Sequence, residues 1–322
     1  MKPTSSKLRA LLASVAVGAA VLLSSPVFAA SPGFTFRLPI KGLSIESATP
    51  APLSPTAAQY MYVTNQGNGT VTVCQVGSGG ALSGCASAAS GFGLPWGVAV
   101  SGSTVFVSDH NNNAVDACQI GASGLLSGCS SQVALNSPTE MSASGTHLFV
   151  AVPAVNAVET CQIGTGGTLS GCVQNTDASF SSPQGVVADG SLAYVANNGN
   201  STISLCSLSS SGTLSGCSTA ATTADGVNKP YALAISGNTL YITTNGVLAC
   251  QIGAGGALSG CASVGSTFAS TMGIGAAGSQ LFVDNEGSSN VSVCQVGSNG
   301  ALSGCATGGS AFMYPYGLAL AP

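Results

Sequence analysis

Six cysteine pairs with one shared spacing run through the chain, and they constrain its fold more than any other feature. Ten residues separate the members of every pair, and successive pairs begin 43 to 45 residues apart. The pairs are Cys74 and Cys85, Cys118 and Cys129, Cys161 and Cys172, Cys206 and Cys217, Cys250 and Cys261, and Cys294 and Cys305. A repeat of about 40–50 residues with strand-like content is typical of a β-propeller or a related array. The spacing therefore predicts an all-β protein of six repeats.

Each repeat contains four short strand-like segments. In the second repeat we expect strands at 95–100, 104–109, 114–120 and 125–130, separated by Gly, Asn and Ser turns. Four such strands make one antiparallel blade. The strand pattern opens at 59–64 with a second strand that has no first strand before it, and it closes at 315–320 with a lone first strand. We expect this last strand to complete the first blade, which gives a closed six-bladed β-propeller of four-stranded antiparallel blades.

The residues between paired cysteines predict how the cysteines bond. Every pair is centred on a dipeptide that ends in Gly, such as Gly79-Gly80 or Asn299-Gly300. Such dipeptides favour two-residue hairpin turns, and a turn of that kind makes the two cysteines cross-strand partners within disulfide reach. A zinc site is the alternative, but it favours closely spaced cysteines with histidines. We therefore predict one disulfide inside each blade and no free thiol, an arrangement typical of proteins that act outside the cell.

The N-terminal residues have the pattern of a secretory signal peptide. Three basic residues precede an apolar run over 11–23, and small residues follow up to Ala29, so we expect cleavage near residue 30. A membrane anchor is the alternative, but the run is shorter than the ~20 residues that a span needs. Residues 31–57 are rich in Pro, and we interpret them as a leader or linker before a propeller at 58–322. We expect a secreted, periplasmic or cell-surface protein with no transmembrane segment once the signal is removed.

Charge excludes one class of partner. Without residues 1–30 the chain keeps three of its six basic residues and all ten acidic residues, a formal charge of −7. Nucleic-acid binding needs clustered Lys and Arg that neutralise phosphates, so we exclude it, and the same argument counts against anionic membrane surfaces. We expect a monomer whose partner is a glycan or an envelope or surface protein.

Several motifs resemble known propellers. Residues 62–65, Tyr-Val-Thr-Asn, together with 69–73 resemble the YVTN family of extracellular and periplasmic propellers, and 194–197 repeat the pattern. The Pro-x-Gly openings at Pro95, Pro183 and Pro315 are similar to those of NHL and lactonase-like propellers. The resemblance covers about residues 58–322 and implies the propeller fold. These families include binding proteins, lyases and lactonases, so the resemblance implies no single activity.

The x position of each Pro-x-Gly opening, or its counterpart in repeats that depart from this motif, is expected at the mouth of the central channel. The first strand of a blade is innermost, and strand direction places the connections before the first strand and after the second strand on one face. The six positions are Trp96, Thr139, Gln184, Tyr231, Met272 and Tyr316. Aromatic rings here could stack a sugar or another flat ligand. The alternative is that these side chains only fill the channel.

Acidic and amide residues are expected on the same face. Asp109 and Asn285 end second strands, His110 follows the first of them, and Glu140 stands where four other repeats have Gly. The oxygens of Asp109, Glu140 and Asn285 are hard ligands suited to Ca²⁺, and a resemblance to six-bladed hydrolases of the paraoxonase group implies a central calcium. Acid–base catalysis would use His110 with Asp109 or Glu140. The alternative is that Asn and Asp cap turns, and then we expect no cofactor.

The sequence thus favours a secreted, disulfide-stabilised propeller that acts without catalysis, as a binding or interaction module with a ligand or partner at the channel mouth. A lactonase-like or calcium-dependent hydrolase with a site on the same face is one alternative. A structural component of the cell envelope is the other.

Overall fold

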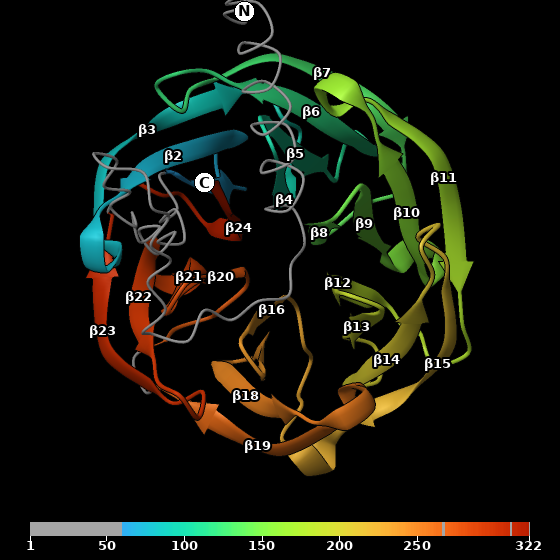
Figure 1. Ribbon diagram of the computed structural model, residues 1–322. Helices are drawn as coiled ribbons and strands as arrows, with labels where there is room; N and C mark the ends of the chain where they lie inside the picture. Colours follow the sequence, from blue (N-terminus) through green and yellow to red (C-terminus); the bar gives the residue numbers. More distant parts are fainter. Residues whose placement is uncertain (1–59, 266–267, 310, 322) are drawn as a thin grey trace, which may run out of the picture. The chain divides into compact units, whose positions relative to one another are not determined.

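The computed structural model describes residues 60–265, 268–309 and 311–321, which form six four-stranded antiparallel sheets arranged in a ring, whose centre we call the channel (Figure 1). We number these blades in chain order. Blade 1 combines β24 with β1–β3, and blades 2 to 6 are β4–β7, β8–β11, β12–β15, β16–β19 and β20–β23. The predicted signal peptide and linker lie outside the described residues. No helix among the described residues is long and apolar enough to cross a membrane.

The four strand positions of a blade recur around the ring. The innermost strands are β24 (Pro315–Ala321), β4 (Pro95–Ser101), β8 (Met141–Ser144), β12 (Pro183–Asp189), β16 (Leu233–Ser236) and β20 (Ile274–Ala277). The second strands are β1 (Tyr60–Asn65), β5 (Thr104–Asp109), β9 (His147–Val152), β13 (Leu192–Asn197), β17 (Thr239–Thr243) and β21 (Gln280–Asn285). The third strands are β2 (Thr70–Val76), β6 (Ala114–Ile120), β10 (Ala157–Ile163), β14 (Thr202–Leu208), β18 (Val247–Ile252) and β22 (Asn290–Val296). The outermost strands are β3 (Leu82–Ser90), β7 (Leu126–Ala134), β11 (Leu169–Thr176), β15 (Leu214–Ala221), β19 (Leu258–Val264) and β23 (Leu302–Gly308).

Short 3-10 helices occupy some connections. Three lie in turns between third and fourth strands: η1 (Ser78–Gly80), η3 (Thr165–Gly167) and η5 (Ala254–Gly256). Two follow second strands, η2 (Pro153–Val155) and η6 (Glu286–Ser288), and η4 (Thr223–Asp225) follows β15.

Pairing between distant strands closes the ring. β24 lies antiparallel to β1, with Tyr60 opposite Ala321 and Val63 opposite Leu318. The innermost strands also contact one another in an unbroken cycle from β4 through β8, β12, β16, β20 and β24 back to β4. The prediction that the last strand completes the first blade is therefore confirmed. Closure matters because it leaves no inner blade edge free to pair with another chain.

The hydrophobic core is divided among the six interfaces between neighbouring blades. Each of the six buried clusters joins two adjacent blades; one of them packs Tyr62 and Val73 of blade 1 against Val105 and Val107 of blade 2. Alternation along the strands explains this division, because successive side chains point to opposite faces of a blade and each face meets a different neighbour.

Buried tyrosines fasten adjacent blades to each other. The hydroxyl of Tyr62 donates to the Gly124 carbonyl at 2.8 Å, and Tyr194 and Tyr241 make the equivalent bonds to Gly256 and Gly300. Each acceptor is the last glycine of the turn between the third and fourth strands of the next blade. Burial raises the pKa of Tyr62 to about 12, so its phenol stays a donor at neutral pH.

All six predicted disulfides are confirmed, one in each blade between its third and fourth strands. They join Cys74 to Cys85, Cys118 to Cys129, Cys161 to Cys172, Cys206 to Cys217, Cys250 to Cys261 and Cys294 to Cys305. The Cα–Cα distances are 4.0–4.1 Å, and no cysteine of the described residues is free. The partners therefore lie directly across the hairpin from each other, as the sequence predicts.

The predicted two-residue turns between these cysteines are wrong. In blade 1 the Gly77 N–H donates to the Ala81 carbonyl, so three residues form the loop between them. A bulge at Gly84, with a φ of 59°, then brings Cys85 opposite Cys74. Glycine is favoured at the bulge because its φ lies in the left-handed region. The longer loop and the bulge together restore the alignment that a two-residue turn would have given.

Candidate functional site

The connections before the first strands and those after the second strands lie together at one mouth of the channel, as the strand directions predict. His110, in the connection after β5, stacks on Trp96 at the start of β4, with ring centroids 4.3 Å apart and planes 8° apart. The opposite face carries the turns between third and fourth strands. His147 lies there, beside Gly212 of such a turn. The two histidines are therefore on different faces, and only His110 is near the mouth.

Three aromatic side chains from different blades converge at this mouth. Trp96 of blade 2 and Tyr316 of blade 1 have ring centroids 4.6 Å apart, and Tyr316 meets Tyr231 of blade 5 edge-on at 6.5 Å. Blades 1 and 5 are not neighbours in the ring, so the contact places these rings over the channel itself. Burial raises the pKa of Tyr316, which keeps its hydroxyl protonated.

The other predicted mouth residues differ in how much they reach solvent. Thr139 is fully buried, and its hydroxyl donates to the Gln184 carbonyl of the next blade at 2.9 Å. Gln184 and Met272 are half-buried. Two buried polar atoms here have no protein hydrogen-bond partner: Trp96 Nε1, which is a donor, and Gln184 Oε1, which is an acceptor. The mouth therefore combines aromatic surface with an unpaired donor and an unpaired acceptor.

The polar residues that end the second strands hold loops in place. The carboxylate of Asp109 accepts hydrogen bonds from the Gly93 and Leu94 N–H groups and from Asn112. Asn285 likewise accepts from the Ala269 N–H and donates to Ser292. The bonds to backbone N–H groups tie each second strand to the loop that enters its own blade. Neither residue shares a hydrogen bond with Glu140 in the described part of the chain, and their assignment as metal ligands stays a prediction.

His110 has a defined tautomer. Its Nδ1 lies 3.1 Å from the Pro138 carbonyl oxygen, which only accepts hydrogen bonds. Nδ1 therefore carries a proton, and Nε2 of the neutral ring is left as the acceptor. This arrangement meets one requirement of a general base, but the carboxylate of Asp109 is bound to backbone N–H groups rather than to the imidazole.

Close packing of the innermost strands explains why most blades have Gly after the mouth residue. A Cβ on Gly97 would lie 2.6 Å from the Thr139 carbonyl oxygen of the next blade, and a Cβ on Gly273 would lie 2.7 Å from the carbonyl oxygen of Tyr316. Contacts this short leave no room for a side chain. Glu140 occupies the equivalent position in blade 3, and its side chain extends to Gly317 of blade 1, past blade 2. Its carboxylate thus lies across the channel.

A third buried acid, besides Asp109 and Glu140, was missed from the sequence. Asp284, in β21, is 0% exposed, and its Oδ1 accepts from the Met272 and Gly273 N–H groups at 2.9 and 2.8 Å. Burial raises the pKa of Asp284 well above its usual value, although these two bonds act against the shift. Burial likewise raises the pKa of Glu140, and the nearby Asp284 raises it further.

The position of Asp284 could have been singled out by aligning the repeats. The equivalent residues in blades 1, 2 and 5 are hydroxyl residues that hold the inner strand. The Thr64 hydroxyl accepts from the Gly317 N–H at 2.8 Å and donates to the Trp96 carbonyl. The Thr243 hydroxyl likewise accepts from the Ala232 N–H and donates to the Met272 carbonyl. An acid at a position where the other blades have a hydroxyl residue or Ala is the signal that was overlooked.

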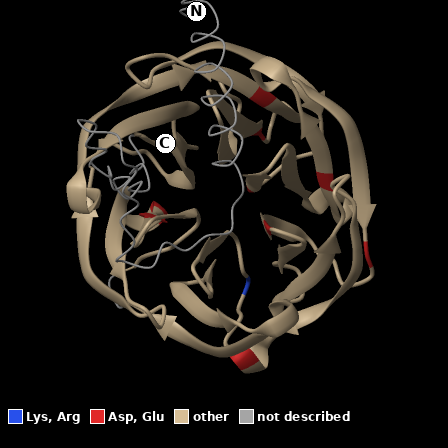
Figure 2. Cartoon of the chain, in the orientation of Figure 1, with Lys and Arg blue, Asp and Glu red and all other residues tan. Residues whose placement is uncertain are grey.

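Charge is sparse across the described residues (Figure 2). Lys229 is the only Lys or Arg among them, and it lies exposed beside Tyr231 and Met272 in a pocket of about 210 Å³ at the mouth. Its φ of 45° is in the left-handed region, as is that of Tyr314 at the equivalent position of blade 1. Tyr314 is 57% exposed. Residues at this position in blades 3, 4 and 6 are serines, so the two large side chains on the rim are exceptions.

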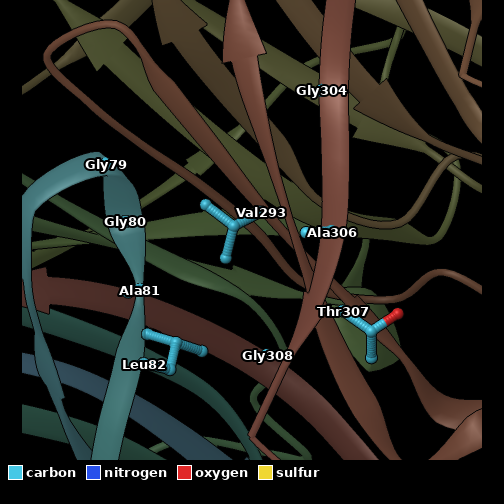
Figure 3. A pocket seen from close by; sticks show the side chains of 9 residues that line it. All are labelled: Gly79, Gly80, Ala81, Leu82, Val293, Gly304, Ala306, Thr307 and Gly308. Carbon is cyan, nitrogen blue, oxygen red and sulfur yellow. The ribbon is translucent and has the colours of Figure 1, made fainter.

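Two further features carry no catalytic groups. A pocket of about 320 Å³ lies between the turn of blade 1 and the outer strands of blade 6, lined by Gly80, Leu82, Val293 and other small or apolar residues (Figure 3). Glu159 lies next to Cys161 and Cys172. Because these two cysteines are joined in a disulfide, they offer no thiolate to a metal.

Solved structures with the same architecture cover nearly the whole propeller. One, from a nidogen/laminin complex, has a TM-score of 0.66 at 12% identity and covers 82% of this chain and 98% of its own. A functionally unknown protein of Desulfotomaculum acetoxidans has a TM-score of 0.59 at 17% identity, covering 83% and 87%. A Bacteroides fragilis structure, provisionally described as a 6-phosphogluconolactonase, has a TM-score of 0.57 at 13% identity, covering 84% and 100%. At these identities the likeness shows the fold alone.

A comparison with curated proteins finds no match. A family model described as "Lactonase, 7-bladed beta-propeller" matches residues 35–310. The described residues form six blades rather than the seven of that description. The match nevertheless spans most of the chain, and the protein therefore belongs to this lactonase-like β-propeller family.

Proposed function

We propose that this protein binds a small ring-shaped ligand, of the sugar or lactone type, at the aromatic mouth of its channel. One observation supports this most: Trp96, Tyr231 and Tyr316 converge there from three blades, beside a buried indole N–H and a buried amide oxygen that lack protein partners. Buried polar groups are normally hydrogen-bonded, and unpaired ones are costly. A ligand with hydroxyl or carbonyl groups would supply both missing bonds while its ring stacks on the aromatics.

The sparse charge supports a mostly neutral ligand. Among the described residues, Lys229 is the one Lys or Arg that could form an ion pair with an anionic substituent at the mouth, and its position beside Tyr231 suits a carboxylate on an otherwise neutral ring. The disulfides support action outside the cytoplasm, because such bonds persist in oxidising compartments. Secretion to the periplasm or cell surface is part of the same proposal.

Tryptophan fluorescence offers a direct test, since Trp96 is the only Trp of the chain. We expect a saturable change in its emission when the purified protein is titrated with monosaccharides, oligosaccharides and five- or six-membered lactones. Calorimetry would then compare Trp96→Ala with the wild type. Tyr60→Ala, on the opposite face, is the matched control, because Tyr60 contacts Gly124 of a turn there.

The packing alternative makes the opposite prediction. Binding lost in Trp96→Ala at an unchanged melting temperature would support the proposal. A large fall in melting temperature, with no ligand bound by the wild type, would mean that the aromatics only fill the channel. That result would favour the structural role in the cell envelope.

Hydrolysis of a lactone is a second candidate, favoured by the family match and by the tautomer of His110. With Nδ1 held by the Pro138 carbonyl, Nε2 can take the proton of a water molecule that attacks the lactone carbonyl. The ring C–O bond then breaks, and the proton returns to the ring oxygen to give a hydroxy acid. Trp96 keeps the imidazole in place by stacking.

A pH-stat assay on simple lactones tests this candidate. We expect acid release by the wild type that falls by ~10²-fold or more in His110→Gln, in line with the loss of a general base. His147→Gln, on the other face, is the control and should retain activity. Activity that persists in His110→Gln, or none in the wild type, would eliminate hydrolysis by His110 and leave ligand binding unaffected.

A further inference from the structure

A lysine breaks the repeat pattern on the rim of the mouth. The residue two positions before the mouth residue is a serine in blades 3, 4 and 6, and it is Lys229 in blade 5. The serines are Ser137, Ser182 and Ser270, and all four residues have a positive φ of 45–51°. This left-handed conformation is unusual for a bulky side chain. A lysine in place of the small residue of the repeat therefore needs a reason other than backbone preference.

The fold uses the backbone at this position rather than the side chain. The Ser182 N–H donates to Asn156 Oδ1 of the preceding blade at 2.6 Å. The Lys229 N–H makes the equivalent bond to Ser201 Oγ at 3.1 Å. These bonds hold the loops that enter blades 4 and 5, whichever side chain is present. The Lys229 side chain is exposed, so its ammonium group is available to a ligand.

The lysine borders a pocket that continues from the mouth. Tyr231 and Met272, two of the mouth residues, line this pocket of about 210 Å³ together with Lys229. Its other lining residues are Asn228, Thr244, Asn245 and Ser270. Their amide and hydroxyl groups donate and accept hydrogen bonds, as the hydroxyls of a sugar require. Among the described residues, none that lines the pocket is acidic. The pocket thus combines one positive charge with neutral polar groups beside an aromatic ring.

Hydrogen bonds between blades 5 and 6 hold the pocket in shape. The Thr271 hydroxyl donates to the Gly246 carbonyl at 2.8 Å, and the Thr243 hydroxyl donates to the Met272 carbonyl at 2.7 Å. Both threonines are fully buried. A site that is already ordered avoids part of the entropy cost of binding.

The charge of the pocket suits a carboxylate. Lys229 is the one Lys or Arg among the described residues (Figure 2). Asp225, an acid of the same loop, accepts from the Thr222 N–H at 2.9 Å and so has a partner within its own turn. A phosphate carries about −1.5 to −2 charges at neutral pH and is commonly bound by an Arg fork or by several N–H groups. A single ammonium group instead matches the single charge of a carboxylate.

We propose that the ligand is an acidic oligosaccharide, with a uronate unit in the Lys229 pocket and a neighbouring neutral unit over the aromatic mouth. The pocket is smaller than the ~300 Å³ at which sites for complete drug-sized ligands begin, so it suits one sugar unit. The uronate carboxylate pairs with Lys229 Nζ. The next ring lies against Tyr231 and Tyr316, whose ring centroids are 6.5 Å apart. The inference rests on the proposed function, because it names the class of that ligand and adds a second subsite.

Calorimetry with two matched disaccharides tests the charge. One is a uronate linked to a neutral sugar, and the other is its carboxyl-reduced form, in which CH₂OH replaces the carboxylate. We expect the wild type to bind the acidic form about 5- to 10-fold more tightly, as for a charge-assisted contact at a partly exposed site. This preference should shrink in about 1 M salt, which screens exposed charges. The free uronate monosaccharide should bind more weakly than the disaccharide, because it fills one subsite.

Matched variants test the role of the lysine. Lys229→Ser gives blade 5 the residue of blades 3, 4 and 6, so we expect it to fold normally and to bind both disaccharides equally. Lys229→Arg keeps the charge and should keep a preference for the acidic form. Ser210→Asp is the control for net charge, because it makes the protein more negative by the same amount as Lys229→Ser. Ser210 is exposed in the turn between β14 and β15, on the opposite face, so this variant should behave as the wild type.

Several results would overturn the inference and leave the proposed function intact. They are equal binding of the two disaccharides by the wild type, and binding of simple lactones but of neither disaccharide. A preference that persists in Lys229→Ser would place the anion elsewhere. Tighter binding of a sugar phosphate or sulfate would contradict the carboxylate, and a monosaccharide that binds as tightly as the disaccharide would eliminate the second subsite. A wild type that binds no sugar and no lactone would instead contradict the proposed function, and this inference with it.

Discussion

At the outer edge of the ring, every blade begins its fourth strand with the same Leu-Ser-Gly-Cys, from 82–85 in blade 1 to 302–305 in blade 6. At the inner edge, the mouth residue and its successor form six different pairs, from Trp96-Gly97 to Tyr316-Gly317. The outer residues make the same bulge and disulfide six times. The inner residues share a backbone path but not a chemistry. The difference indicates that the peripheral residues maintain the fold, whereas the residues at the centre can vary and are available for ligand binding.

Removing the repeated outer feature should have the largest effect. Each disulfide closes a short loop and adds up to about 3 kcal/mol in the chain-entropy model. Six such contributions exceed the 5–15 kcal/mol of a typical folded domain. We therefore expect the fully reduced protein to lose its cooperative thermal transition, as followed by circular dichroism. A reduced protein that melts within a few degrees of the oxidised one would show that interblade packing suffices.

Restoring the repeat pattern at the inner edge should have a smaller, opposite effect. The double variant Glu140→Gly, Asp284→Thr gives blades 3 and 6 the residues found at the same positions of other blades. A buried polar group left without a hydrogen-bond partner costs about 1–3 kcal/mol, and this variant removes two such groups. We expect a gain in this range at neutral pH, measured by denaturant unfolding. An equal or lower stability would mean that the acids already have compensating partners.

The same two acids predict how stability depends on pH without divalent cations. Burial raises the pKa of Glu140 and of Asp284 above their unfolded values. Their protonated forms therefore favour the fold, fully so below the unfolded pKa of about 4, and this contribution is lost as pH rises through the higher folded pKa values. We expect wild-type stability in chelator to fall from acidic to neutral pH. Glu286 and Tyr316 also lie near Asp284, so the double variant, which keeps both, is the control and should show a flatter profile.

Relieving strain on the rim should have the smallest effect on stability. Tyr314 has a φ of 50°, a conformation that costs a non-glycine residue ~1–2 kcal/mol. Tyr314→Gly removes this conformational cost but raises the entropy of the unfolded chain. We therefore expect the free energy of unfolding to rise by about 0.5–1 kcal/mol. Ser182→Gly, at the same position of blade 4, should gain as much. If Tyr314→Gly binds ligand more weakly and Ser182→Gly does not, Tyr314 contributes to the binding site at the mouth. If the two variants bind equally well, Tyr314 only shapes its loop.

Periodicity explains why so much of the fold could be predicted from the sequence. The cysteine spacing, the strand alternation and the unmatched first and last strands are local signals that recur in phase, so errors in one repeat are corrected by the others. The turn length could not be read in this way. Two consecutive small residues such as Gly79-Gly80 fit loops of two or three residues, and the choice depends on the bulge at Gly84.

The centre was harder to predict because its geometry depends on ring closure. Glu140 was recognised because it replaces a glycine, and the predicted mouth positions of Trp96, Tyr231 and Tyr316 do meet. Asp284 was missed because a strand pattern alone does not reveal that its side chain turns toward Gly273 and Gly317. Asp109 and Asn285 share their strand-end position with other blades, and their local bonds to the entering loops are visible only in the structure.

The pairing of β24 with β1 also sets an order of events for the growing chain. Every disulfide joins residues only 11 positions apart, so each hairpin can oxidise before the rest of the ring has folded, with its correct partner nearest along the chain. Blade 1 is different, because its innermost strand is residues 315–321 and exists only after the other five blades have been made. All the covalent links are thus short-range, and the one contact that joins the two ends of the ring is noncovalent and forms last. A protease that cut before β24 would open the propeller while leaving all six disulfides intact.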